Sequence, residues 1–136
     1  MKIESKIGTI KKPQSEVYTF LADFSNYSKV IPEGYTTNWK VSGDACSFTI
    51  KGLGDIQVKM FDKDPPENLK FTGEINAKNI EFTIWIQLSD ITPSITKIKL
   101  AIDTELPPFL DLFAKKPLQE GIDTGVDQIE KLFENI

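Results

Sequence analysis

Apolar and polar residues alternate with a period of two through most of the chain, first over positions 1–10 and then over positions 36–105. This alternation is typical of β-strands that bury one face and expose the other. It predicts seven strands, one before and six after an interruption at positions 11–35, with turns at KGLGD and DKDPPEN. We therefore expect an antiparallel sheet that is covered on one side and wet on the other.

The interruption has the pattern of a short amphipathic helix. Pro13 suits the first turn of a helix, where its missing N–H has no intrahelical partner to lose. Val17, Phe20, Leu21 and Phe24 then follow at the i, i+3, i+4 and i+7 spacing of one helical face. This face is expected to pack on the covered side of the sheet.

A second short helix is expected directly after the first. Asp23 and Ser25 can cap its start, and Tyr27 lies within it. Pro32 would end it, because the residue before a proline is pushed out of the helical region.

The last segment predicts a long amphipathic helix that opens at Pro107 and Pro108, with Pro117 as a candidate position for a kink. Its apolar positions recur at steps of four and three: Leu118, Ile122, Val126, Ile129 and Phe133.

The order of elements is thus one strand, two short helices, six strands and one long helix. In the first strand, the alternation places Ile3, Ser5, Ile7 and Thr9 on one face. We predict a single domain over residues 1–136 of the α+β class, in which a seven-stranded antiparallel curved sheet wraps around the C-terminal helix.

Two absences in the composition narrow the chemistry. The chain has no histidine, and its basic residues are all lysine. Nucleophile systems that depend on histidine are therefore excluded, as are imidazole zinc sites, which the single Cys46 cannot replace. Without arginine and with a net charge of −4, nucleic-acid binding is not expected. We predict no metal and no cofactor, whereas carboxylate, lysine and tyrosine chemistry stay open.

The same residues bear on location. No apolar run reaches the roughly 18 residues of a membrane span, and charges run through the N-terminal segment, which therefore lacks the pattern of a signal peptide. The single cysteine fits a reducing compartment. We expect a cytoplasmic protein, monomeric or homodimeric, whose membrane contact is at most transient.

The stretch KPQSEVYTFLADFSNYSKVIPE, set after the first strand, resembles the START/SRPBCC superfamily with its helix-grip fold. Members show a proline, a Val-aromatic pair, Leu-x-Asp and a second proline, which match Pro13, Val17-Tyr18, Leu21 with Asp23, and Pro32. The segments IPEGY, GLGDI and LPPFL are similar to the carbon-monoxide dehydrogenase subunit-like branch, and polyketide cyclase-like members also look close. The opening segment alone is similar to coenzyme-Q-binding members as well.

The resemblance implies a cavity between the sheet and the long helix for a hydrophobic or amphipathic small molecule. Together with the inward pattern, it assigns these ligand-lining candidates: Phe20, Phe24, Tyr27, Trp39, Phe48, Ile50, Val58, Met60, Phe71, Phe82, Ile84, Ile98, Leu100, Phe109, Phe113 and Ile122. The alternative for each of them is simple packing against the last helix. Gly121 and Gly125 fit either space for a ligand or close helix packing.

Three functions follow from this interpretation. The first is a binding or carrier protein for a lipid, isoprenoid or aromatic molecule, without catalysis. The second is a polyketide cyclase- or dehydratase-like enzyme with a tyrosine as the acid, which requires a polar group in the cavity. The third is a maturation or membrane-recruitment factor that acts through an exposed apolar patch around Phe109, Leu110 and Phe113.

Overall fold

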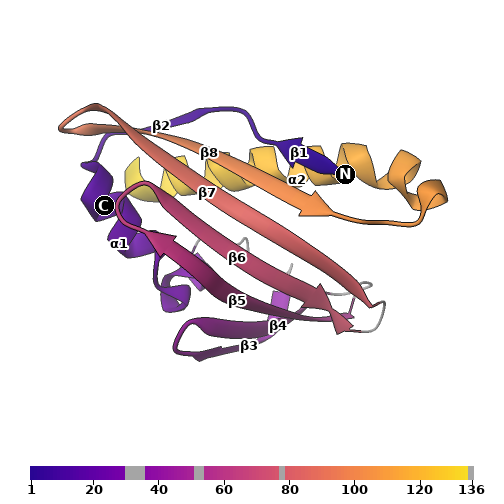
Figure 1. The fold of residues 1–136 in the computed structure, drawn as a ribbon. Coiled ribbons are helices and arrows are strands. Elements are labelled where there is room, and N and C mark those ends of the chain that lie inside the picture. The colour runs from indigo at the N-terminus through magenta and orange to yellow at the C-terminus, as the bar shows by residue number, and fades with distance from the viewer. Residues whose placement is uncertain (30–35, 51–53, 77–78, 135–136) are drawn as a thin grey trace.

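A computed structural model describes residues 1–29, 36–50, 54–76 and 79–134 of the chain (Figure 1). The predictions for Pro32 and for the side chain of Phe109 fall outside the described residues. The elements are, in order, β1 (Lys2–Glu4), β2 (Gly8–Ile10), α1 (Gln14–Leu21), the 3-10 helix η1 (Phe24–Lys29), β3 (Thr36–Ser42), β4 (Ala45–Ile50), β5 (Gly54–Asp64), β6 (Asn68–Ile75), β7 (Ile80–Thr92), β8 (Ile95–Thr104) and α2 (Pro108–Glu134).

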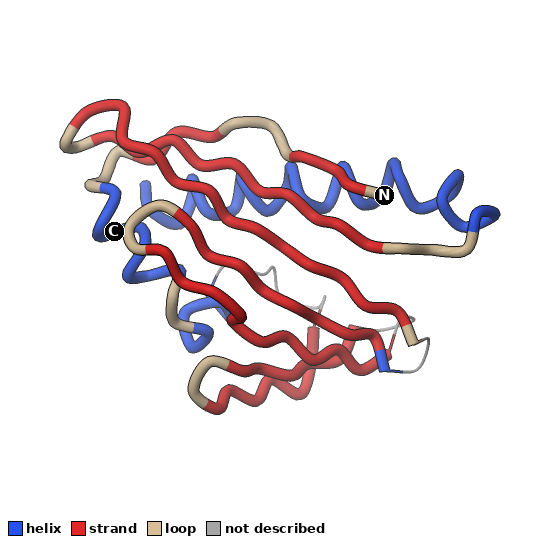
Figure 2. The backbone as a smooth tube through the Cα atoms, viewed as in Figure 1, coloured by secondary structure: helices blue, strands red, loops and turns tan. Residues whose placement is uncertain are grey.

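The strands form one antiparallel sheet in the order β1-β8-β7-β6-β5-β4-β3, and β2 continues the line of β1 along β8. The helices lie on one side of this sheet, as the tube in Figure 2 shows. The predicted α+β class, the order of elements and the long C-terminal helix are confirmed.

The first strand differs from the prediction in its second half. Ile3 pairs with Ile102 and Gly8 pairs with Ile98, so five steps along the first strand pass four steps along β8. The extra residue is a bulge, which reverses the alternation of faces. Gly8 and Ile10 therefore face the core, and the inward placement of Ile7 and Thr9 was wrong: Ile7 is 58% exposed.

Both predicted short helices are present. Pro13 precedes the first turn of α1, and the α1 residues Val17 and Leu21 are fully buried. Asp23 caps the start of η1, because its Oδ1 accepts hydrogen bonds from the backbone N and the Oγ of Ser25, at 3.0 and 2.5 Å. These bonds also lower the pKa of Asp23.

α2 packs on the β1, β2 and β8 edge of the sheet (Figure 1). Its predicted inward residues Ile122, Val126, Ile129 and Phe133 are buried. Pro117 lies inside this helix. No described helix combines the length and the apolar character that a membrane crossing requires.

Candidate functional site: the half-covered inner face of the sheet

The inner face of the sheet is apolar from β3 to β8, but the helices cover it unevenly. Near β8 the inward side chains of Ile98 and Leu100 are buried. Toward β3 and β4, inward side chains such as Phe48 and Ile50 are only half-buried. The reason is the position of α2, which lies against the β8 edge and leaves β3 and β4 at the opposite side of the sheet (Figure 1). This half-covered end is the candidate ligand site.

A stacked aromatic pair forms one wall of this end. The rings of Trp39 in β3 and Phe48 in β4 lie 4.7 Å apart between centroids, with an angle of 21° between their planes. The indole Nε1 of Trp39 donates a hydrogen bond to Oγ1 of Thr36 at 2.6 Å. Its only polar atom is thus satisfied, and the two rings present a flat apolar surface.

Phe82 in β7 adjoins this wall, and its position depends on Gly73 in β6, its register partner. A Cβ atom on Gly73 would overlap Cζ of Phe82. The missing side chain therefore makes room for the ring, which is half-buried beside Val58 of the same cross-strand row. Residues of this row place apolar groups on the inner face at mid-sheet.

An aromatic cluster closes the site toward α1. Phe24 lies 5.4 Å from Tyr27 and 5.6 Å from Phe71 between ring centroids. The hydroxyl of Tyr27 donates a hydrogen bond to the backbone oxygen of Leu21 at 2.6 Å. Burial raises the pKa of Tyr27, and nearby Cys46 raises it further. Tyr27 therefore stays neutral, with its proton engaged by the backbone.

Cys46 also faces the inner side and is 5% exposed. Burial raises the pKa of its thiol to about 11, so the group is neutral at physiological pH. A neutral buried thiol is a weak nucleophile. Cys46 thus behaves as the small hydrophobe that its position in the strand predicts.

Other hydroxyl groups that a catalytic hypothesis could use are engaged by the backbone as well. The hydroxyl of Tyr18 donates to the oxygen of Asn68 at 3.1 Å, and burial raises its pKa. Oγ1 of Thr104 donates to the oxygen of Glu81 at 2.9 Å. Charged side chains are absent from the inner face of the described strands, so the chemistry at this face is that of a hydrocarbon surface.

The structure brings most of the predicted ligand-lining residues into one connected set. Those buried in the core are Phe24, Met60, Phe71, Ile98, Leu100 and Ile122. Those half-buried are Phe20, Tyr27, Trp39, Phe48, Ile50, Val58, Phe82 and Ile84. Phe20 contacts Phe133 of α2, with ring centroids 5.1 Å apart. Phe113, in contrast, points to solvent and is 76% exposed.

Two half-buried residues of the same face were missing from the predicted set. Ile75 and Ile80 pair with each other in register and continue the row that contains Phe48 and Ile56. Their alternation with polar neighbours is the signal that would have included them.

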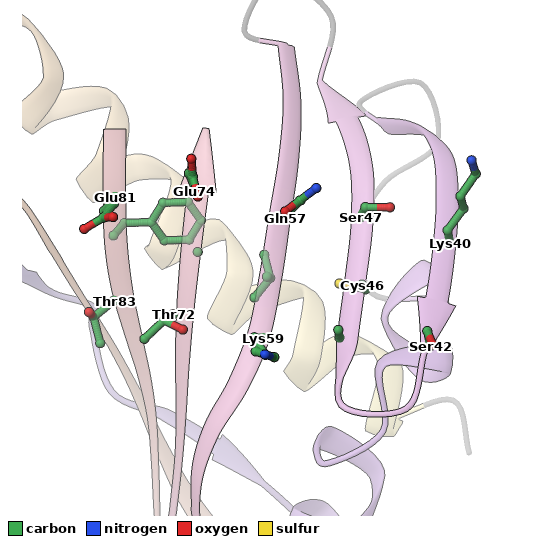
Figure 3. A pocket seen from close by; sticks show the side chains of 14 residues that line it. Lys40, Ser42, Cys46, Ser47, Gln57, Lys59, Thr72, Glu74, Glu81 and Thr83 are labelled. Atoms are coloured by element: carbon green, nitrogen blue, oxygen red, sulfur yellow. The ribbon is translucent and has the colours of Figure 1, made fainter. Parts of the chain in front are cut away.

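A hollow of about 570 Å³ lies on the opposite, outer face of the sheet. In Figure 3 its labelled side chains come from β3 to β7, with α2 behind the strands. Lys40, Lys59, Glu74 and Glu81 supply its charges. The sequence analysis did not single out this hollow, because outward polar positions are expected on any wet sheet face. Among the described residues, no group of acidic, histidine or cysteine side chains is arranged to hold a metal ion.

Comparison with known proteins supports the fold. No protein-family model matches the chain, and no curated protein matches it in sequence. In structure, the chain is similar to a START superfamily protein from Mycobacterium smegmatis, with a TM-score of 0.79, 11% identity, and coverage of 98% of this chain and 97% of that chain. The chain has the helix-grip fold.

Two further structures with the helix-grip arrangement are those of enzymes. A point mutant of norcoclaurine synthase from Thalictrum flavum, in complex with a transition-state analogue, matches with a TM-score of 0.78, 12% identity, and coverage of 99% of this chain and 94% of that chain. The di-domain ARO/CYC BexL matches with a TM-score of 0.77 and 13% identity over 96% of this chain and 45% of that chain. Identities at this level establish the fold alone, and the branch within the superfamily stays a prediction.

Proposed function

We propose that this helix-grip protein binds a hydrophobic small molecule at the half-covered end of its inner face and acts as a carrier rather than as an enzyme. The observation that carries the proposal is the Trp39–Phe48 stack, an aromatic surface that the fold leaves half-buried beside Phe82. Half-covered apolar surface of this kind is stabilised when a ligand removes it from water.

The polar groups around the site favour binding over catalysis. Tyr27 donates its proton to a backbone oxygen, and its raised pKa makes it a poor acid. The thiol of Cys46 is neutral at physiological pH. A cyclase-like reaction needs a group that can give or take a proton at the substrate, and neither residue is free to do so.

The positions of the two tryptophans make a direct test available. Trp39 lies on the inner face, whereas Trp85 in β7 alternates with the inward Ile84 and Ile86 and faces outward. Trp85→Phe leaves Trp39 as the only reporter, and Trp39→Phe leaves Trp85 as the matched control. We would measure acrylamide quenching of each variant with farnesol, hexadecanoate or naphthalene as the probe.

The proposal predicts that at least one probe protects Trp39 from quenching and leaves Trp85 unchanged. Native mass spectrometry of freshly isolated protein should also detect a bound apolar compound. Equal quenching of Trp39 with and without all three probes, together with ligand-free native spectra, would refute the proposal. Conversion of a bound compound during incubation would instead support the cyclase-like alternative.

A further inference from the structure

Two aromatic rings and two lysines form a strip across the outer face of the sheet. Nζ of Lys70 in β6 lies 4.9 Å from the ring centroid of Phe61 in β5 and 5.7 Å from that of Trp85 in β7. Nζ of Lys2 in β1 lies 5.2 Å from the Trp85 centroid. We call Lys2, Phe61, Lys70 and Trp85 the aromatic–lysine strip. None of these residues belongs to the inner-face site.

A bulge in β5 exposes the apolar end of the strip. Met60 pairs with Phe71 and Asp62 pairs with Lys70, so Phe61 is the extra residue between two ladder pairs. Met60 is buried, whereas Phe61 is 64% exposed. Bulges re-aim side chains at specific positions of a sheet, and this one presents a phenyl ring to solvent beside an ammonium group.

The lysines of the strip are available to an external anion. Among the described residues, neither Lys2 nor Lys70 forms an ion pair. Two nearby carboxylates are engaged elsewhere: Glu4 binds Lys99 at 3.3 Å, and Asp103 lies 3.8 Å from the N-terminal ammonium. Asp62, the register partner of Lys70, is exposed and makes no ion pair with it.

We propose that the aromatic–lysine strip docks on the surface of an anionic lipid bilayer. Lysine side chains can lie along apolar surface and extend their ammonium groups to the headgroups, where anionic lipids attract them. Tryptophan prefers this interfacial depth, and the exposed Phe61 ring supplies an apolar contact below it. Charge complementarity thus selects this face in a chain whose net charge is −4, and the contact is weak and reversible.

Two other occupants fit the strip less well. A two-fold contact with a second copy would place each strip against itself and bring its unpaired lysines together. A nucleic-acid base needs an open ring face for stacking, whereas both lysine ammonium groups lie over the Trp85 ring. The net charge of the chain also opposes a polyanion of high charge density.

Co-sedimentation with phospholipid vesicles tests the proposal in the full chain. We expect binding to vesicles of 70% phosphatidylcholine and 30% phosphatidylserine at low salt, weaker binding at 150 mM NaCl, and no binding to pure phosphatidylcholine. Lys70→Ala should lower the partition coefficient about fivefold, and Phe61→Ser should lower it about tenfold. In the Trp39→Phe background, vesicles should shift the emission of Trp85 to the blue.

Phe113→Ser and Lys97→Ala are the matched controls, because they remove an exposed ring and an exposed lysine outside the strip. Both should bind vesicles like the wild type. The proposal fails if the wild type ignores anionic vesicles, if the strip variants bind normally, or if Phe113→Ser alone abolishes binding. None of these outcomes depends on a ligand at the inner face, so this proposal and the proposed function can fail separately.

Discussion

Gly8 in β2 and Val126 in α2 are in such close contact that no side chain fits between them. A Cβ atom on Gly8 would lie 2.5 Å from Cγ1 of Val126 and 3.0 Å from Cγ2 of Ile98. Val126 is fully buried and, as a β-branched residue, has little rotamer freedom to yield. This contact determines how closely the long helix approaches the sheet at its β8 edge.

Gly8→Ala should therefore destabilise the protein by about 1–3 kcal/mol, the usual cost of overpacking a core. The free energy of unfolding in urea would measure this loss. Gly121→Ala is the matched control in α2, because nothing lies within 4 Å of an added Cβ there. That variant should gain up to about 1 kcal/mol from helix propensity. A Gly8→Ala protein as stable as the wild type would contradict the contact.

Gly73→Ala should be milder than Gly8→Ala, although the added Cβ would meet the Phe82 ring at an even shorter distance. The ring is half-buried and can turn aside, so we expect a loss of about 1 kcal/mol. In a Phe82→Ala background the same substitution should have almost no effect. A double-mutant cycle measured by urea unfolding gives the coupling energy, and a coupling near zero would contradict the contact.

Thr96 in β8 should contribute to stability through its hydroxyl. It is fully buried, and its Oγ1 donates a hydrogen bond to the backbone oxygen of Lys12 at 2.7 Å, which joins β8 to the start of α1. Thr96→Val keeps the shape but leaves that oxygen without its donor, which should cost about 1–2 kcal/mol. Thr96→Ser keeps the hydroxyl and should retain this bond. Equal stability of the valine variant and the wild type would exclude the role.

The Cys46 thiol should make stability depend on pH in the alkaline range. Burial raises its pKa from the ordinary 9.0 to about 11, so the folded state holds the proton more tightly than the unfolded chain. The contribution is constant below about pH 9 and is lost as the pH rises from about 9 to about 11, by about 2–3 kcal/mol. Urea unfolding between pH 8 and pH 10.5 would measure the difference between the wild type and Cys46→Ala. Parallel curves for the two proteins would refute the shift.

The helices and strands could be predicted from local periodicity because each element repeats at its own interval. Leu118 and Phe133 belong to one helical stripe, and Phe82 and Ile84 belong to one strand face, without reference to distant residues. Where two strands interact over a bulge, the local pattern fails. Ile7 and Phe61 both lie at such a bulge, and pairing with β8 and β6 determines where each one points.

The candidate site was predictable as a face but not as a place. The apolar alternation identified Trp39, Phe48 and Phe82 as inward, and the structure groups them at one end. Nothing in their spacing distinguishes them from Leu100, which has the same alternation and is buried against α2. The difference lies in which part of the face the helix reaches.

The sequence by itself determined that this chain is an α+β protein with one apolar sheet face, no histidine or arginine chemistry and a long C-terminal helix. Those properties depend on side-chain type and short-range spacing. Only the tertiary structure decided that α2 packs against the β8 edge through Gly8 and leaves the Trp39–Phe48 end half-covered. Helix placement depends on contacts between residues more than a hundred positions apart, which no local pattern records.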